Sequence, residues 1–211
     1  MEAFLVSTVV VAAAEIGDKT QLLSLLLAAR YKKPWPIIIG IFFSTLFNHA
    51  LAGAVGEWIR RLVDPHWLRW GVGASFLAIA LWTLKPDKLD ETETPMAGHS
   101  IFWITFVAFF LAEMGDKTQI ATVLLAAKYQ ALASVVSGTT IGMMMANVPA
   151  VLLGNALAQK IPFKAVRYAA AVIFAALGII ALANPNLGQP RRCPGDPSVA
   201  PYLLPLDLSS A

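Results

Sequence analysis

Six long apolar stretches divide this sequence, and they constrain its fold more than any other feature. They are Ala3–Ala28, Pro36–Ile59, Trp67–Leu84, Ile101–Ala127, Leu132–Leu157 and Ala165–Ala183. Each has roughly 18–27 residues, which is enough to cross a hydrocarbon core of about 30 Å as a helix. Because lipid offers no hydrogen bonds to the backbone, a spanning segment must satisfy its own polar groups. The pattern therefore predicts an all-α integral membrane protein with six transmembrane helices.

The composition agrees with this class and excludes several others. Of the 211 residues, 57% are hydrophobic and only 14% are charged, against roughly a quarter charged in soluble domains. This balance excludes a disordered chain and a nucleic-acid-binding arm, and it makes the lipid bilayer the expected partner. The only cysteine is Cys193, so an internal disulfide and a cysteine-based zinc site are excluded. Nothing in the sequence indicates an oligomer.

The sequence repeats itself at an offset of 98 residues without a gap. Residues Glu15–Tyr31 are identical to Glu113–Tyr129 at 11 of 17 positions, and the same offset pairs Phe76 with Phe174. This indicates duplication of a three-helix unit. Since three is odd, the second unit should enter the membrane from the opposite side, which predicts two inverted three-helix repeats.

The duplication predicts the organisation of the chain. We expect a first repeat over residues 1–85, a polar linker over 86–100, a second repeat over 101–184 and a proline-rich, disordered tail over 185–211. Six spans place both termini on one side. With the amino terminus outside, the inner connections hold eight Lys and Arg residues and the outer segments hold six, so the positive-inside rule favours termini outside.

Each copy of the repeated motif places charges in the middle of an apolar stretch. Glu15 follows about 12 apolar residues, a rise of about 18 Å, or roughly half a bilayer. Their helical spacing places Glu15 and Asp18 on one face, three residues apart, and Glu113 and Asp116 repeat the arrangement. A carboxylate at this depth costs at least about 2.5 kcal/mol. These side chains should therefore face a bundle interior or a wet cavity.

The charge of the two motifs matches a divalent cation. Glu, Asp and Lys give each motif a formal charge of −1, and together the motifs carry −2. Carboxylate, hydroxyl and amide oxygens are hard ligands that suit Mn²⁺ and Ca²⁺. The candidate metal ligands are Glu15, Asp18, Thr20, Gln21, Glu113, Asp116, Thr118 and Gln119. The supporting residues are Lys19 and Lys117 as counter-ions, with Asn48 and Asn147 as further polar groups.

Protons should compete with the cation for these ligands. Buried carboxylates bind protons more readily than exposed ones, and mutual exclusion of protons and a divalent cation is the minimum requirement of an antiporter. No cofactor is expected, because the metal is the transported substrate and the proton is the coupling ion. Gly17 and Gly115 are compatible either with close helix packing or with a local opening that frees backbone carbonyls.

Three alternatives remain on these residues alone. In the first, the charged groups have a purely structural role and form salt bridges that hold the helices together. Buried ion pairs stabilise a fold poorly, which weakens this alternative. An intramembrane aspartyl protease would use Asp18 and Asp116 as a dyad that shares a proton. An exporter of another small cation or of an amino acid would show a large pocket and indifference to Mn²⁺.

A duplicated E-x-G-D-[KR]-[TS] motif in a small six-helix chain resembles the GDT-type cation/proton exchanger family. That family includes bacterial manganese exporters and eukaryotic Golgi and chloroplast manganese/calcium transporters. The resemblance covers about residues 3–184. It implies a secondary transporter in the cell's inner or plasma membrane that exchanges Mn²⁺, with Ca²⁺ as a second substrate, for protons. The family's functional acidic positions fall on Glu15, Asp18, Glu113 and Asp116.

Overall fold

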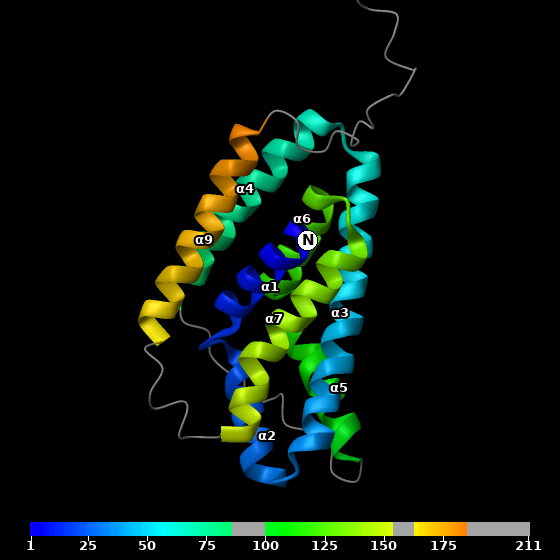
Figure 1. The fold of residues 1–211 in the computed structure, drawn as a ribbon, viewed down its shortest axis with the longest axis vertical. Helices are drawn as coiled ribbons and strands as arrows, with labels where there is room; N and C mark the ends of the chain where they lie inside the picture. Colours follow the sequence, from blue (N-terminus) through cyan, green and yellow to red (C-terminus); the bar gives the residue numbers. More distant parts are fainter. Residues whose placement is uncertain (86–99, 154–162, 185–211) are drawn as a thin grey trace, which may run out of the picture.

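The computed structural model describes residues 1–85, 100–153 and 163–184 (Figure 1). All regular elements in these residues are α-helices, which confirms the all-α prediction for the described part of the chain. The helices are α1 (Glu2–Glu15), α2 (Lys19–Tyr31), α3 (Pro34–Leu62), α4 (Pro65–Thr83), α5 (Ile101–Glu113), α6 (Lys117–Tyr129), α7 (Leu132–Leu153) and α9 (Phe163–Ala183). The predicted linker, except Ser100, and the predicted tail lie outside the described residues, as do residues 154–157 of the fifth predicted span.

Two of the predicted spans are not continuous helices, so the prediction was wrong at these places. Ala3–Ala28 contains α1 and most of α2, and Ile101–Ala127 contains α5 and most of α6. The cause is glycine, because Gly17 and Gly115 have φ angles of 84° and 73°. Residues with a Cβ atom adopt this left-handed region only at a cost in conformational energy. Each helix therefore ends at the motif glutamate, and a new helix begins after the motif aspartate.

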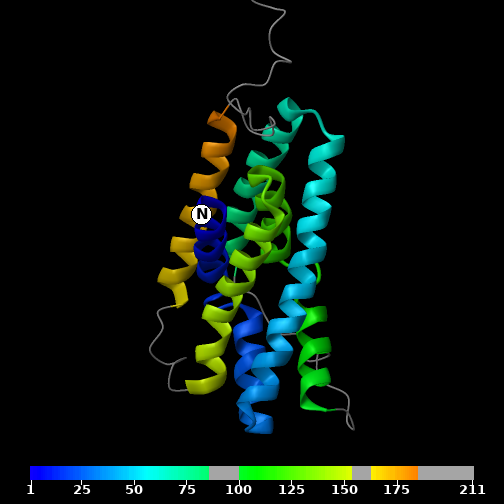
Figure 2. The same cartoon turned by 45° about the vertical axis from the view of Figure 1, so that its right-hand side comes forward.

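The two broken helices run in opposite directions through the molecule. Figures 1 and 2 show α2 and α5 together at the lower end, with α1 and α6 further up. The long helices α3 and α7 connect these levels: α3 contacts α5, α6 and α7, and α1 and α2 both pack on α7. The motif of each half therefore lies in the interior, where the four half-length helices meet.

Small residues allow helices of the two halves to approach closely. A Cβ added to Gly40 of α3 would lie 2.8 Å from Thr105 Cβ of α5, and one added to Gly138 of α7 would lie 3.0 Å from Ser7 Cβ of α1. Gly40 and Gly138 are related by the repeat offset, and so are Ser7 and Thr105. The same contact is thus made twice, each time between a helix of one half and a helix of the other.

The helices α4 and α9 form a pair beside this centre (Figure 1). Phe76 of α4 and Phe174 of α9 are fully buried and stacked, with ring centroids 6.3 Å apart. These residues are also equivalent in the repeat. Gly73 admits Leu182 into the same interface. The pair packs against α1 through α9 and against α6 through α4.

The helix lengths and the outer surface suit a membrane. By length and mean hydropathy, two described helices qualify singly as spans: α3 with 29 residues and a value of 1.7, and α7 with 22 residues and 1.5. The half-length helices are each too short to qualify, but α1 with 14 residues and α2 with 13 residues together have a length of about 40 Å. Large apolar side chains point outward, among them Phe47, Leu81 and Trp103 at 51%, 72% and 55% exposure.

Candidate cation site

The motif builds the same backbone break in both halves. Glu15 is the last residue of α1 and Asp18 is the N-cap of α2, so the expectation that they share one helix face was wrong. The Asp18 N–H donates to the Glu15 carbonyl at 3.0 Å, and Asp116 donates to the Glu113 carbonyl at 3.1 Å. Aspartate is favoured at an N-cap because its negative charge faces unpaired N–H groups and the positive end of the helix dipole.

The motif glutamines complete the break. Gln21 Oε1 accepts from the Gly17 N–H at 2.9 Å, and Gln119 Oε1 accepts from the Gly115 N–H at 2.7 Å. Each glutamine is the third residue of its helix and reaches back to a donor that the helix leaves unpaired. Gln21 and Gln119 were both predicted as metal ligands. Their side-chain oxygens instead accept hydrogen bonds from the backbone turn between the glutamate and the aspartate of each motif.

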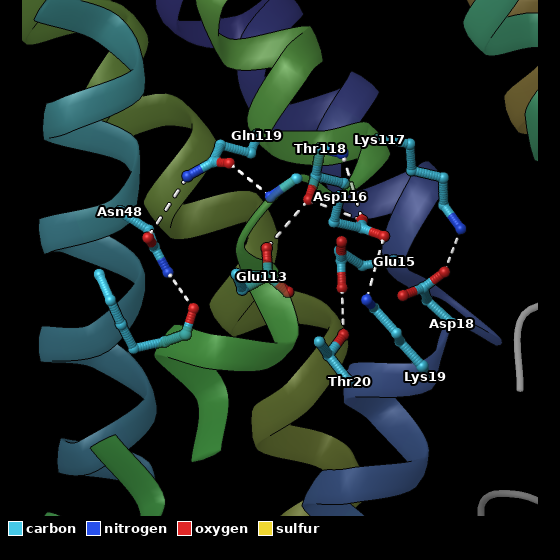
Figure 3. Close-up of polar contacts among 12 residues, drawn as sticks. Glu15, Asp18, Lys19, Thr20, Asn48, Glu113, Asp116, Lys117, Thr118 and Gln119 are labelled. Carbon is cyan, nitrogen blue, oxygen red and sulfur yellow. Dashed lines mark hydrogen bonds and ion pairs between the residues drawn. The ribbon is translucent and has the colours of Figure 1, made fainter. Parts of the chain in front are cut away.

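The two predicted asparagines occupy different environments. Asn48 Oδ1 accepts from Gln119 Nε2 at 3.4 Å, and its amide donates to the Phe110 carbonyl at 3.2 Å. Asn48 therefore ties α3 to the second break (Figure 3). Asn147 accepts from Ser24 Oγ at 2.7 Å and donates to a carbonyl of its own helix. Asn147 thus joins α7 to α2, below the first break.

Three carboxylates from the two motifs converge in the interior. Glu15, Glu113 and Asp116 each offer an oxygen, and these oxygens all lie within 4.8 Å of one another. Both glutamates are fully buried and Asp116 is 3% exposed. Figure 3 shows the three side chains directed toward a common point between the two breaks. Carboxylates at this separation repel one another strongly unless protons or a cation intervene.

The motif threonines orient the glutamates. Thr20 Oγ1 donates to Glu15 Oε2 at 2.5 Å. Thr118 Oγ1 donates to Glu113 Oε2 at 3.0 Å and lies 3.3 Å from Asp116 Oδ2. Among the described residues, Oε1 of each glutamate is buried without a hydrogen-bond partner. An unpaired buried carboxylate oxygen is costly, and a bound cation would remove that cost.

Each motif lysine crosses to the aspartate of the other motif. Lys117 Nζ donates to Asp18 Oδ1, and Lys19 Nζ lies 3.6 Å from Asp116 Oδ1 (Figure 3). Four carboxylates and two ammonium groups give the cluster a formal charge of −4 + 2 = −2. The lysines balance the aspartates, so the remaining charge belongs to the two glutamates. Sequence reasoning assigned the lysines as counter-ions but did not identify these partners.

Two further polar side chains are buried: sequence reasoning passed over Ser24 and interpreted His49 as a pore-facing or packing residue rather than a metal ligand. Ser24 donates to Asn147, and a hydroxyl at the equivalent repeat position, Thr122, was the available signal. His49 stands at the repeat position of Asn147 and is fully buried. Neither of its ring nitrogens has a hydrogen-bond partner among the described residues. No residue-type pattern in the sequence distinguishes this histidine from a packing residue.

Comparison with known proteins identifies relatives along nearly the whole chain. A family model described as "Divalent cation/proton antiporter GDT1" matches residues 3–91 and 101–188. A Vibrio cholerae protein named "Putative manganese exporter" is 51% identical over 175 residues, covering 82% of this chain and 87% of the relative. "GDT1-like protein sll0615" of Synechocystis is 26% identical over 201 residues, covering 85% and 96%. "Protein PAM71-homolog, chloroplastic" of Arabidopsis thaliana is 28% identical over 194 residues, covering 76% and 53%. No solved structure matches the chain.

The matched residues contain both acidic motifs. The family consists of transporters, so the protein is not an enzyme, and the protease alternative is excluded. The geometry agrees, because Asp18 and Asp116 each pair with a lysine of the other motif. From the two-part match and the 51% identity, the chain belongs to the GDT1 family of membrane transporters, which exchange divalent cations for protons.

Proposed function

We propose that this protein exports Mn²⁺ in exchange for protons and that Glu15, Glu113 and Asp116 form the core of its cation site. The observation that carries the proposal is the convergence of these three buried carboxylates within 4.8 Å. They come from both halves of the chain, so a cation bound there would bridge the halves. A movement of one half against the other would then act on the bound cation directly.

The donor atoms favour a hard divalent cation. The candidate ligands in the cluster are all oxygens, from the three carboxylates and from the hydroxyls of Thr20 and Thr118. Mn²⁺ and Ca²⁺ both take such ligands, with water completing the shell. Helices α1 and α5 end at the two glutamates, so the negative ends of their dipoles also favour a cation. The name of the Vibrio cholerae relative supports Mn²⁺ as the main substrate, with Ca²⁺ as a second one.

Proton exchange follows from the same charge. Without a cation, the net charge of −2 in a buried site favours uptake of protons by the carboxylates. A divalent cation delivers the same charge as two protons, so either one neutralises the cluster. The site therefore has a reason to bind one or the other and to release protons when it takes the metal.

The proposal includes the membrane topology. Six spans, formed by α1–α2, α3, α4, α5–α6, α7 and α9, would make two inverted three-helix repeats in the inner or plasma membrane, with both termini outside. The opposite directions of the two broken helices support this arrangement (Figures 1 and 2). The reciprocal contacts of Gly40 and Gly138 support it as well. Reporter fusions at each terminus test the orientation.

Transport in proteoliposomes tests the function. Mn²⁺ added outside vesicles that hold a pH dye should drive proton movement, and Glu15→Gln or Glu113→Gln should abolish it. Glu57→Gln is the matched control, because Glu57 pairs with Arg60 and Arg61 at the end of α3, away from the cluster. Full Mn²⁺ exchange by both site variants would reject the proposed site. A panel of Mn²⁺, Ca²⁺, Mg²⁺, Zn²⁺ and Co²⁺ ranks the substrates.

A further inference from the structure

The two lysine–aspartate pairs are equivalent in sequence but unequal in the structure. In the pair of Lys117 with Asp18, the side chains are 4% and 0% exposed. In the pair of Lys19 with Asp116, the charged atoms lie 3.6 Å apart and the side chains are 21% and 3% exposed. One pair is therefore closed away from solvent, and the other is looser and open on the lysine side.

The backbone beside the pairs shows the same inequality. Gly115, next to Asp116, is exposed, and a Cβ added to it would meet nothing within 4 Å. Gly17, next to Asp18, is only partly exposed. Exposed or partly exposed groups thus lie beside Asp116, whereas the contact of Asp18 with Lys117 is buried.

The two aspartates also differ in whether they belong to the cluster of potential ligands. Within the described residues, the group whose oxygens lie within 4.8 Å contains Asp116 but not Asp18. Asp116 is held by the looser pair, and Asp18 is engaged by Lys117. The aspartate that belongs to the cluster is therefore the one whose lysine is partly exposed. An ammonium group beside a divalent cation is repelled, so a cation bound by Asp116 would displace Lys19.

We infer that Lys19 and Lys117 are positioning residues that alternate as exchangeable and closing counter-ions. In this conformation Lys19 leaves Asp116 when the cation enters, while Lys117 holds Asp18 away from the cation and closes the opposite side. The repeat relation exchanges these roles in the opposite conformation, where Asp18 becomes the ligand and Lys19 closes on Asp116. The inference rests on the proposed function, because it requires a cation at this cluster and two inverted halves.

Lysine reactivity in the unmodified protein tests the inference. Sealed vesicles of each orientation are treated with a small, membrane-impermeant amine-acylating reagent, and modified lysines are identified by mass spectrometry. Lys19 should be modified from one side and Lys117 from the other. Saturating Mn²⁺ should speed modification of Lys19 about fivefold, the order of protection that a partly exposed ion pair gives. Lys33, exposed between α2 and α3, reports vesicle orientation and should not respond to Mn²⁺.

Two variants supply a matched check. Asp116→Asn should raise the reactivity of Lys19 without Mn²⁺ and remove its response to Mn²⁺. Asp18→Asn should likewise raise the reactivity of Lys117 without Mn²⁺ and remove any response of Lys117 to Mn²⁺. Modification of both lysines from the same side, or protection of Lys19 from both sides, would overturn the inference. Mn²⁺ binding is measured on the same protein by electron paramagnetic resonance. Absence of binding defeats the proposed function, whereas binding that leaves Lys19 unchanged defeats the inference alone.

Discussion

At the scale of single residues, the repeated motif divides its tasks among side chains that differ in chemistry. Glutamate supplies a buried carboxylate at the end of one half-helix, and aspartate caps the next half-helix. Threonine connects the two, since Thr118 contacts both Glu113 and Asp116. A hydroxyl is well suited to this place because it orients two carboxylates without adding charge. Its loss should therefore affect the ligands more than the fold.

We predict that Thr118→Val weakens Mn²⁺ binding by roughly 10- to 100-fold, because hydrogen bonds to charged groups contribute about 1.5–3 kcal/mol. Equilibrium binding of Mn²⁺ to the purified protein measures the effect. Thr122→Val is the control: Thr122 is equally buried, but its hydroxyl donates only to the Thr118 carbonyl at 2.8 Å. Equal affinity losses in the two variants would contradict a specific role for Thr118.

At the scale of elements, the broken helices are the feature that makes the site. A continuous helix would direct Glu15 and Asp18 along one face and would pair all the intervening backbone groups. The break instead exposes helix ends to the interior and sends Asp18 toward Lys117 of the other half. The left-handed φ of the motif glycine is its physical cause. In both breaks the motif glutamine accepts from the glycine N–H, and in the second break Asp116 also accepts from the Thr118 N–H.

A glycine replacement tests this account of the break. Gly115→Ala should lower both thermal stability and Mn²⁺ transport, because an L-residue at this φ costs about 1–2 kcal/mol even though the site has space for a methyl group. Gly71→Ala is matched, since Gly71 is exposed in α4 with nothing within 4 Å. It should be neutral or stabilising by up to about 1 kcal/mol. Identical melting temperatures for the two variants would refute the strain argument.

At the scale of the whole molecule, each half completes the other. Helix α1 packs on α7 and α5 packs on α3, so the long helix of each half supports the broken helix of the other. The ion pairs cross between the halves in the same way. A site shared between two interlocked halves is suited to alternating access, because relative movement changes the site from both sides.

The pH dependence of binding belongs to this scale, because the cluster carries charge from both halves. Lowering the pH increases proton occupancy of the carboxylates, so the apparent Kd for Mn²⁺ should rise as pH falls. The rise should approach about tenfold per pH unit for each proton displaced. Mn²⁺ titrations between about pH 6 and pH 8 measure the slope. An affinity that does not vary with pH would contradict exchange of Mn²⁺ for protons at this site.

Sequence reasoning predicted the helical class and the residues that form the cluster, but it did not predict the break between α1 and α2. The lengths of the apolar stretches indicate the helical class, and the offset of 98 residues indicates the duplication. Hydropathy, however, does not distinguish a continuous helix from two half-helices, because both bury the same residues. The glycines at 17 and 115 were compatible with packing or with opening. Only the backbone angles of the structure show that the glycines open the helices rather than merely allow close packing.

The amino-acid sequence by itself determined which charged groups gather in the interior of this protein, because four charged or amide motif positions occur in each of two apolar stretches and must avoid lipid together. Tertiary structure alone decided how those charges pair. Lys117 meets Asp18, while Lys19 lies more loosely beside Asp116. Identical motifs cannot specify unequal pairs. That difference arises from how the two halves pack against each other, since packing sets the separation and solvent access of each ion pair.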